Sequence, residues 1–145
     1  MIVLIQRVSQ ASVTVDGNLI GAIEKGLLVF IAIEPTDTEA KAQRLAQRVA
    51  GYRIFEDEKG KMNLNVKQVE GDILVVSQFT LAADTTKGMR PSFTQAAPHE
   101  MSNYLYEFFC TQLRALEFSV PTGIFGADMK VSLLNDGPAT FRLTC

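Results

Sequence analysis

Apolar and polar residues alternate along the first part of the chain. Residues 2–9 and 11–16 each show the period of two that is typical of a strand with one buried face. Asp16-Gly17 then precedes a third short segment, residues 18–23, and Asp-Gly is a frequent dipeptide in tight hairpin turns. The pattern predicts a β-hairpin near the N-terminus.

Two later segments are apolar without interruption. Residues 27–33 (LLVFIAI) and 71–82 (GDILVVSQFTLA) predict strands that are covered on both faces, because a strand with one solvent face would alternate. Residues 52–55 predict a short strand, and residues 56–63 predict a polar loop.

Helical spacing of apolar residues occurs twice. The first predicted helix covers residues 38–50, and Thr36 with Glu39 resembles a capping box at its start. The second covers residues 99–116, directly after Pro98. Its apolar stripe consists of Met101, Leu105, Phe108, Phe109, Leu113 and Leu116.

The C-terminal region contains two apolar runs, residues 129–134 and 139–144, around Asn135-Asp136-Gly137-Pro138. These four residues all favour turns, so the runs predict two closing strands around a turn. An X-Pro bond is cis in only about 5–6% of cases, so the dipeptide alone favours a trans turn. Many strands and two helices predict one α/β domain, residues 1–145, whose sheet layers carry helices on one side.

Composition adds bounds to this fold. Hydrophobic residues make up 47% and charged residues 21% of the 145 residues, as in ordinary globular proteins. The N-terminus reads as a strand without a basic region, no apolar run suggests a membrane span, and two cysteines form no disulfide framework. We therefore expect a cytoplasmic protein. The net charge of −2 argues against a large nucleic-acid footprint, although not against a small basic patch.

Most candidate catalytic residues have a structural explanation that is simpler. The single histidine, His99, is a possible general base, but an exposed residue in a first helical turn is the favoured interpretation. Cys110 lies beside an apolar helix stripe and is expected to be an inert, semi-buried thiol. No metal-ligand spacing, phosphate loop or dinucleotide motif occurs, so we expect neither a metal nor a cofactor.

Two segments suggest a functional site. Ser77, Gln78 and Thr80 are polar residues at the exit of a buried strand, a pattern that indicates either a cleft or an ordinary solvent-exposed strand end. Lys87 and Arg90 lie in an irregular loop, residues 84–92, which suits phosphate contact as well as it suits simple solvation.

Several motifs together resemble the D-aminoacyl-tRNA deacylase family. SQFTL (77–81) and NDGPAT (135–140) match its two signatures, and the similarity continues through the whole chain. The other matching stretches are residues 5–17, 53–63, 83–93 and 122–138. The resemblance implies a β/β/α sandwich that forms a homodimer with active sites at the interface. It also implies hydrolysis of the ester between a D-amino acid and the 3′-terminal adenosine of tRNA.

The resemblance also assigns roles to individual residues. The Gly137-Pro138 pair is expected to be cis and to reach, with Asn135, into the substrate pocket of the partner subunit, held in place by Arg7. The expected site residues are Ser77, Gln78, Phe79 and Thr80 at the catalytic wall, Met129 and Phe125 near the terminal adenine, and Lys87 and Arg90 on the tRNA.

The chemistry of the expected reaction leaves alternatives open. Backbone amides around Phe79 and Thr80 are candidates for an oxyanion hole. The nucleophile is either Thr80 or a water that the ribose 2′-OH of the substrate activates, and we favour the second because no base stands beside Thr80. A pocket that only excludes L side chains also admits glycine, so glycyl-tRNA is an expected substrate. A non-enzymatic dimeric domain and a hydrolase of another nucleotide-linked ester are the rival interpretations.

Overall fold

Seven strands, two α-helices and one 3-10 helix make up the fold in a computed structural model that describes residues 1–145. The strands are β1 (Ile2–Val15), β2 (Asn18–Ile23), β3 (Gly26–Ala32), β4 (Phe55–Glu56), β5 (Met62–Leu64), β6 (Asp72–Ser77) and β7 (Lys130–Thr144). The helices are α1 (Glu39–Gly51), α2 (His99–Ala115) and the 3-10 helix η1 (Phe79–Ala82).

The long strand β1 organises the main sheet. Its first half pairs with β3, its second half pairs with β2, and β7 runs antiparallel beside almost all of it. On the other side of β3, β6 pairs in parallel, which gives the order β2-β1-β3-β6 with β7 on β1. The two segments predicted at 2–9 and 11–16 are therefore one continuous strand, because both pair with β7.

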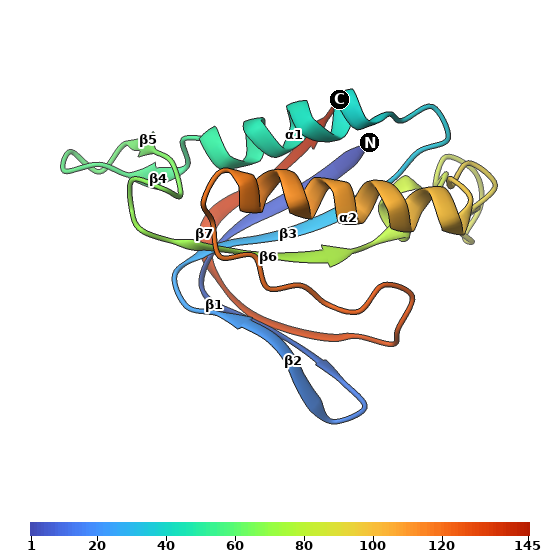
Figure 1. Cartoon of the computed structure of the whole chain (residues 1–145), viewed down its shortest axis with the longest axis horizontal. Coiled ribbons are helices and arrows are strands. Elements are labelled where there is room, and N and C mark those ends of the chain that lie inside the picture. Colours follow the sequence, from blue (N-terminus) through green and yellow to red (C-terminus); the bar gives the residue numbers. More distant parts are fainter.

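Two apolar cores lie on opposite faces of this sheet. Both α-helices pack on one face, and Leu27 and Val29 of β3 belong to the larger core beneath them (Figure 1). Leu28, between those two residues, points the other way and packs with Val13 of β1 and Leu74 of β6. The curled arm of β1, β2 and β7 covers that second face, so the predicted β/β/α layers and the two fully covered strands are confirmed.

Gly21 lets the arm approach the sheet closely. A Cβ atom at Gly21 would lie 2.9 Å from the carbonyl oxygen of Thr122 and 3.4 Å from Leu74. Any side chain would therefore push β2 away from β6. The hairpin turn at Asp16-Gly17 is as predicted, with positive φ angles of 49° and 78°.

The ends of several elements differ from the prediction. Thr38, and not Thr36, caps α1, because its side chain accepts a hydrogen bond from the Lys41 amide. The strand predicted at 52–55 is only Phe55–Glu56, and it forms a small hairpin with β5 inside the predicted polar loop. The run predicted as one strand over 71–82 ends as a strand at Ser77 and continues as η1.

The predicted turn at residues 135–138 overlaps a bulge, residues 136–139, and does not separate two strands. Thr140 pairs with Gln6 and Asn135 pairs with Val8, so four residues of β7 stand opposite one residue of β1, Arg7. Both predicted closing strands run in the same direction along β1, and this shared partner makes them a single strand. The bulge expels the middle of the segment from the sheet.

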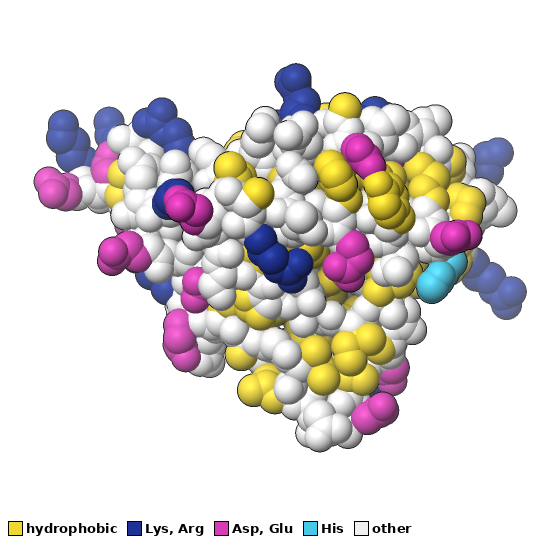
Figure 2. Space-filling model, viewed as in Figure 1, with side chains coloured by type: hydrophobic (Ala, Val, Ile, Leu, Met, Phe, Trp, Pro, Cys, Tyr) yellow, Lys and Arg dark blue, Asp and Glu magenta, His cyan; other side chains and the backbone are white.

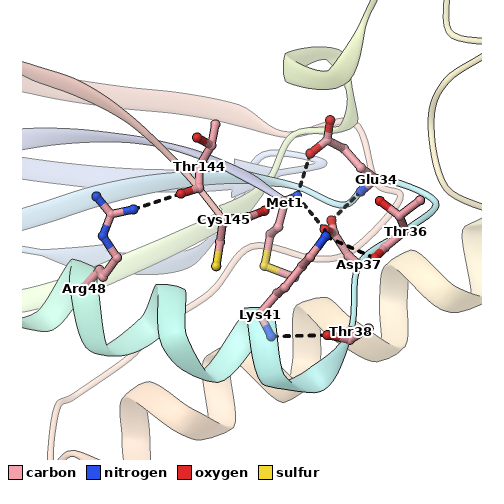
Figure 3. A network of polar contacts seen from close by, with 9 residues as sticks. All are labelled: Met1, Glu34, Thr36, Asp37, Thr38, Lys41, Arg48, Thr144 and Cys145. Atoms are coloured by element: carbon pink, nitrogen blue, oxygen red, sulfur yellow. Dashed lines mark hydrogen bonds and ion pairs between the residues drawn. The ribbon is translucent and has the colours of Figure 1, made fainter.

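A polar network joins the two ends of the chain (Figure 3). The Met1 amino group lies 2.6 Å from a carboxylate oxygen of Asp37 and 2.6 Å from one of Glu34. Asp37 is fully buried and also accepts a hydrogen bond from the Glu34 amide. The Cys145 amide donates to the Met1 carbonyl, so β1 and β7 end side by side. No helix combines the length and the apolar character that crossing a membrane requires.

Candidate active site

A pocket of about 470 Å³ opens where β3 and β6 end. Its walls come from the ends of these strands, from the first turns of α2 and from residues 125–131. Twelve of its 18 lining residues are hydrophobic, which is typical of a site that encloses an organic ligand. The pocket thus lies at the strand exit where the sequence places polar residues.

Ser77, Gln78 and Phe79 form one wall of this pocket. Ser77 is the last residue of β6, and the Gln78 amide donates to the Ile31 carbonyl at 2.8 Å, which ties this wall to β3. Phe79 begins η1 and exposes more than half of its side chain. Thr80 is exposed and does not line the pocket, but its hydroxyl accepts a hydrogen bond from the Gln78 side-chain amide.

The backbone amides of Phe79 and Thr80 stand at the start of η1, and the first N–H groups of a helix have no acceptor within the helix itself. None of the hydrogen bonds of the turns, loops and side chains starts at either amide, and neither residue belongs to a strand ladder. Backbone amides need an acceptor, and water or a ligand oxygen can supply one at a helix start. This wall can therefore offer N–H donors to an oxygen atom in the pocket.

Another part of the pocket lining is mainly apolar and contains Phe125 and Met129. The Met129 side chain occupies the space that a Cβ atom at Gly123 would take, so only glycine at position 123 allows this close contact. Phe125 packs against His99 at 5.0 Å and against Tyr106 at 5.6 Å between ring centroids. An adenine-sized ring is compatible with such an apolar, aromatic wall.

Sequence reasoning missed the contribution of α2 to the pocket. His99, Ser102 and Tyr106 all line it, and their spacing of three and four residues places them on one helix face. The Tyr106 hydroxyl donates to the Val75 carbonyl at 3.2 Å, and burial raises the pKa of this phenol above its ordinary value. His99 is exposed, as expected, but it also stands at the pocket.

Cys110 lies deeper in α2 and is fully buried, where the sequence predicted a semi-buried thiol. Burial raises the pKa of its thiol to about 12. A thiol that stays protonated at neutral pH is a poor nucleophile, so Cys110 belongs to the core.

The remaining predicted substrate-binding residues form a second cluster at the β7 bulge. Arg7 is only 4% exposed; its Nε donates to the Asp136 carbonyl at 3.0 Å and its Nη1 to the Ile54 carbonyl at 2.7 Å. Asn135 donates from its side chain to the Arg7 carbonyl at 3.0 Å. The Gly137-Pro138 bond is cis, against the trans turn that the dipeptide alone favours and as the resemblance implies.

This bulge cluster does not line the pocket of its own chain. Gly137 and Pro138 are exposed, and neighbouring Leu133 and Leu134 expose large apolar side chains on the same strand. The structure thus separates the predicted site residues into a pocket group and a bulge group.

Lys87 and Arg90 are exposed in the loop between η1 and α2, and neither forms a salt bridge with an acidic side chain. The base of this loop is closed by a pair of backbone hydrogen bonds between Asp84 and Ser92, at 2.9 and 3.0 Å. Hydrogen bonds from Thr86 lower the pKa of Asp84. Elsewhere, cationic and acidic side chains are interspersed on the face shown in Figure 2, with no broad basic stripe.

Comparison with known proteins identifies the family. The family model described as D-Tyr-tRNA(Tyr) deacylase matches residues 4–144. A protein of Colwellia psychrerythraea named D-aminoacyl-tRNA deacylase is 75% identical over 144 residues, which is 99% of each chain. One of Saccharophagus degradans with the same name is 59% identical, also over 99% of each chain.

Solved structures agree with the fold. One described as "c-Myc DNA Unwinding Element Binding Protein" superposes with a TM-score of 0.94 at 40% identity, over 100% of this chain and 99% of its own. Another, a probable eukaryotic D-amino acid tRNA deacylase, has a TM-score of 0.85 at 19% identity, over 99% of this chain and 98% of its own. The pocket, the two signature segments and the full-length matches lead to one conclusion: this chain belongs to the D-Tyr-tRNA(Tyr) deacylase family of enzymes.

Proposed function

We propose that this protein hydrolyses the ester that joins a D-amino acid to the 3′-terminal adenosine of tRNA, releasing free tRNA and the D-amino acid. Family membership over residues 4–144 is the observation that carries the proposal. The apolar pocket supports it, because Phe125 and Met129 offer a wall for a nucleobase in the same cavity that Ser77, Gln78 and Phe79 line. A cytoplasmic location, where tRNA is charged, is part of this proposal.

The bulge group is proposed to complete the pocket of a second subunit. Gly137 and Pro138 are exposed and do not reach the pocket of their own chain, while Arg7 and Asn135 hold them in a defined position. β7 pairs with β1 along one edge only and carries exposed Leu133 and Leu134, which favours contact with another chain. A two-fold homodimer would then contain two equivalent shared sites.

Discrimination between D- and L-amino acids is proposed to rest on exclusion. Attractive contacts with one methyl group are worth only about 1–3 kcal/mol, so strong discrimination needs an obstacle where the L side chain would point. Main chain suits this purpose because it cannot rotate away as a side chain can. The bulge offers such main chain, since Arg7 and Asn135 bond to its backbone.

Catalysis is proposed to use the substrate as well as the protein. The amides of Phe79 and Thr80 would stabilise the developing oxyanion, and the ribose 2′-OH next to the ester would activate water. Thr80 is the other candidate nucleophile, but its hydroxyl contacts Gln78, which is no base. His99 packs edge-on against Phe125 and has no hydrogen-bond partner that would orient it as a base.

The direct test incubates the protein with D-tyrosyl-tRNA and with L-tyrosyl-tRNA and measures the ester that remains. We expect loss of the D-ester and survival of the L-ester. Survival of both would favour the non-enzymatic interaction domain, and loss of a different nucleotide-linked ester alone would favour the other rival hydrolase.

Glycyl-tRNA is expected to be cleaved in the same assay. Glycine has no side chain at either the D or the L position of its α-carbon, so an obstacle to L side chains does not exclude it. The measurement is the first-order rate of ester loss beside that of D-tyrosyl-tRNA. If glycyl-tRNA survives under conditions that consume the D-ester, recognition requires more than steric exclusion.

Thr80→Ala is expected to keep most of the deacylase activity, with a rate within about threefold of the wild-type rate, because the proposed mechanism uses the Thr80 amide and not its hydroxyl. Single-turnover rates with D-tyrosyl-tRNA measure this. Thr94→Ala, at another exposed threonine of the same loop region, is the matched control. An acyl-enzyme trapped on Thr80 would establish covalent catalysis instead.

The Lys87→Ala/Arg90→Ala double variant is expected to bind tRNA more weakly and with less dependence on salt. The slope of log affinity against log salt is negative, and each lost phosphate contact on a single strand makes it less steep by about 0.7. Affinity measured between low and moderate salt tests this. Lys59→Ala/Lys61→Ala, two exposed cations on the β4–β5 hairpin, is a control with the same charge change and should leave the slope as it is.

A further inference from the structure

Two aromatic rings are exposed side by side at the rim of the pocket. Phe79 is 57% and Phe93 is 42% exposed, and their ring centroids are 5.2 Å apart at an interplanar angle of 58°. Large aromatic side chains are usually mostly covered in folded proteins. This pair, which we call the aromatic platform, therefore presents ring surface that nothing in the chain covers.

The aromatic platform is continuous with the pocket. Phe79 lines the pocket and also contacts Phe93, which does not line it. A ligand that leaves the pocket past Phe79 reaches the Phe93 ring next. The platform thus extends the site beyond the pocket by enough ring surface for one further planar group, such as a nucleobase.

Phe93 is held by an ordered loop. It directly follows Ser92, whose backbone forms two hydrogen bonds with Asp84. The Asp84 carboxylate accepts from the Thr86 amide at 2.9 Å and from its hydroxyl at 2.7 Å. These contacts fix the base of the loop and thus the backbone next to Phe93.

The same loop carries positive charge without negative partners. Lys87 and Arg90 form no salt bridge, and Met89 between them is fully exposed. The whole chain carries a net charge of −2, so these two cations form a local positive site beside the exposed rings and are not part of a general positive charge. Rings together with cations are the combination that binds single-stranded nucleic acid, because rings stack on bases and cations contact phosphates.

We propose that the aromatic platform stacks the nucleobase that precedes the terminal adenosine, while Lys87 and Arg90 contact the adjoining phosphates. The inference rests on the proposed function, since it takes the pocket as the site of the terminal adenosine. Stacking on a ring tolerates any base, so the platform reads the presence of a single-stranded nucleotide and not its identity.

The test compares two substrates that differ only in the added nucleotides: D-tyrosyl-adenosine and the D-tyrosyl ester of the trinucleotide cytidylyl-cytidylyl-adenosine. We expect kcat/KM of the wild-type protein to be about tenfold higher for the trinucleotide ester. Phe93→Leu keeps an apolar side chain without a ring and should reduce this ratio to about twofold or less. Tyr104→Leu, which removes an aromatic residue of similar exposure (55%) on α2, should keep the wild-type ratio.

A wild-type ratio near one, or a ratio that Phe93→Leu leaves unchanged, would overturn the proposal. A second copy of this chain is the other group that could cover the rings. Sedimentation of Phe93→Leu tests this, and dissociation of the variant into monomers would show that the rings belong to a subunit interface and would overturn the proposal. If the wild-type protein cleaves neither ester, the proposed function fails, and binding decides the platform separately. The probe is then an unacylated trinucleotide with 2-aminopurine at the middle position. Quenching of its fluorescence by the wild-type protein but not by Phe93→Leu supports stacking. Equal quenching, or no quenching, by both proteins overturns the proposal.

Discussion

Asp37→Asn is expected to lower the free energy of unfolding by about 1–3 kcal/mol, because it removes the fully buried one of the two carboxylates that lie 2.6 Å from the Met1 amino group. Asp37 is fully buried against the Met1 amino group, and its second oxygen accepts from the Glu34 amide at 2.7 Å. An asparagine amide in that place would turn an N–H toward either the ammonium or the Glu34 N–H. Urea unfolding measures the effect as a lower midpoint at unchanged slope.

Glu117→Gln is the matched control for this charge change. Glu117 pairs with Lys67 at 3.3 Å, but both side chains are largely exposed. Exposed ion pairs contribute about 0–1 kcal/mol, so this variant should unfold almost as the wild-type protein does. Equal midpoints for the two variants would mean that the Met1 network adds little to stability.

Arg7→Ala is expected to reduce kcat/KM for D-tyrosyl-tRNA by roughly 10²-fold, since a small displacement of a positioning element has effects of that size. The variant removes both bonds from the guanidinium to the Ile54 and Asp136 carbonyls. The buried Ile54 carbonyl then has lost its donor, which also costs about 1–3 kcal/mol of stability. Steady-state kinetics on D- and L-esters, with urea unfolding beside them, separate the two effects.

Arg53→Ala controls for the loss of an arginine. Its Nε donates to the Asn63 carbonyl at 2.8 Å on the exposed β4–β5 hairpin, far along the chain from either signature segment. This variant should keep its activity. An active and fully selective Arg7→Ala protein would contradict the proposed role of the bulge.

Subunit mixing distinguishes a shared site from one within a single chain. Arg7→Ala damages the bulge, and Gln78→Ala damages the pocket wall. In a mixed two-fold dimer, one site would combine the intact wall of the first chain with the intact bulge of the second. Activity recovered on mixing two inactive variants supports a shared site, and no recovery contradicts it.

The sequence predicted the sheet well because burial dominates it. Strands β3 and β6 have both faces covered, and their uninterrupted apolar runs follow directly from that position. Apolar character alone does not fix the conformation, however. Residues Phe79–Ala82 continue the run of β6, but they lie at the pocket rim and form a 3-10 helix.

Long-range pairing explains the difference at the C-terminus. Asn135–Pro138 has the composition of a turn, and local preference alone predicts a change of direction there. The two flanking runs instead pair with one strand, β1, over nearly its full length. Which strand a segment pairs with is a property of the whole sheet, and the local letters do not contain it.

The site was only partly visible for a similar reason. Ser77 and Gln78 were candidates because buried polar groups need partners, although the same pattern also fits a solvent-exposed strand end. The pocket-lining face of α2 with His99, Ser102 and Tyr106 was not predicted, because a helix face that lines a pocket has the same spacing as one that faces solvent or core. The ion pair of Met1 with Asp37 likewise depends on folding that brings residues 36 positions apart into contact.

The place of Arg7 in β1 has a consequence for how recognition works. Arg7 pairs with Leu27 of β3 on one side and faces the bulge on the other, in the strand that joins every layer of the sheet. Amide protons at such a central strand exchange with solvent only when most of the domain opens. The backbone obstacle that is proposed to exclude L side chains would therefore be in place before the substrate arrives. Recognition would then follow a lock-and-key mode and would not require induced fit.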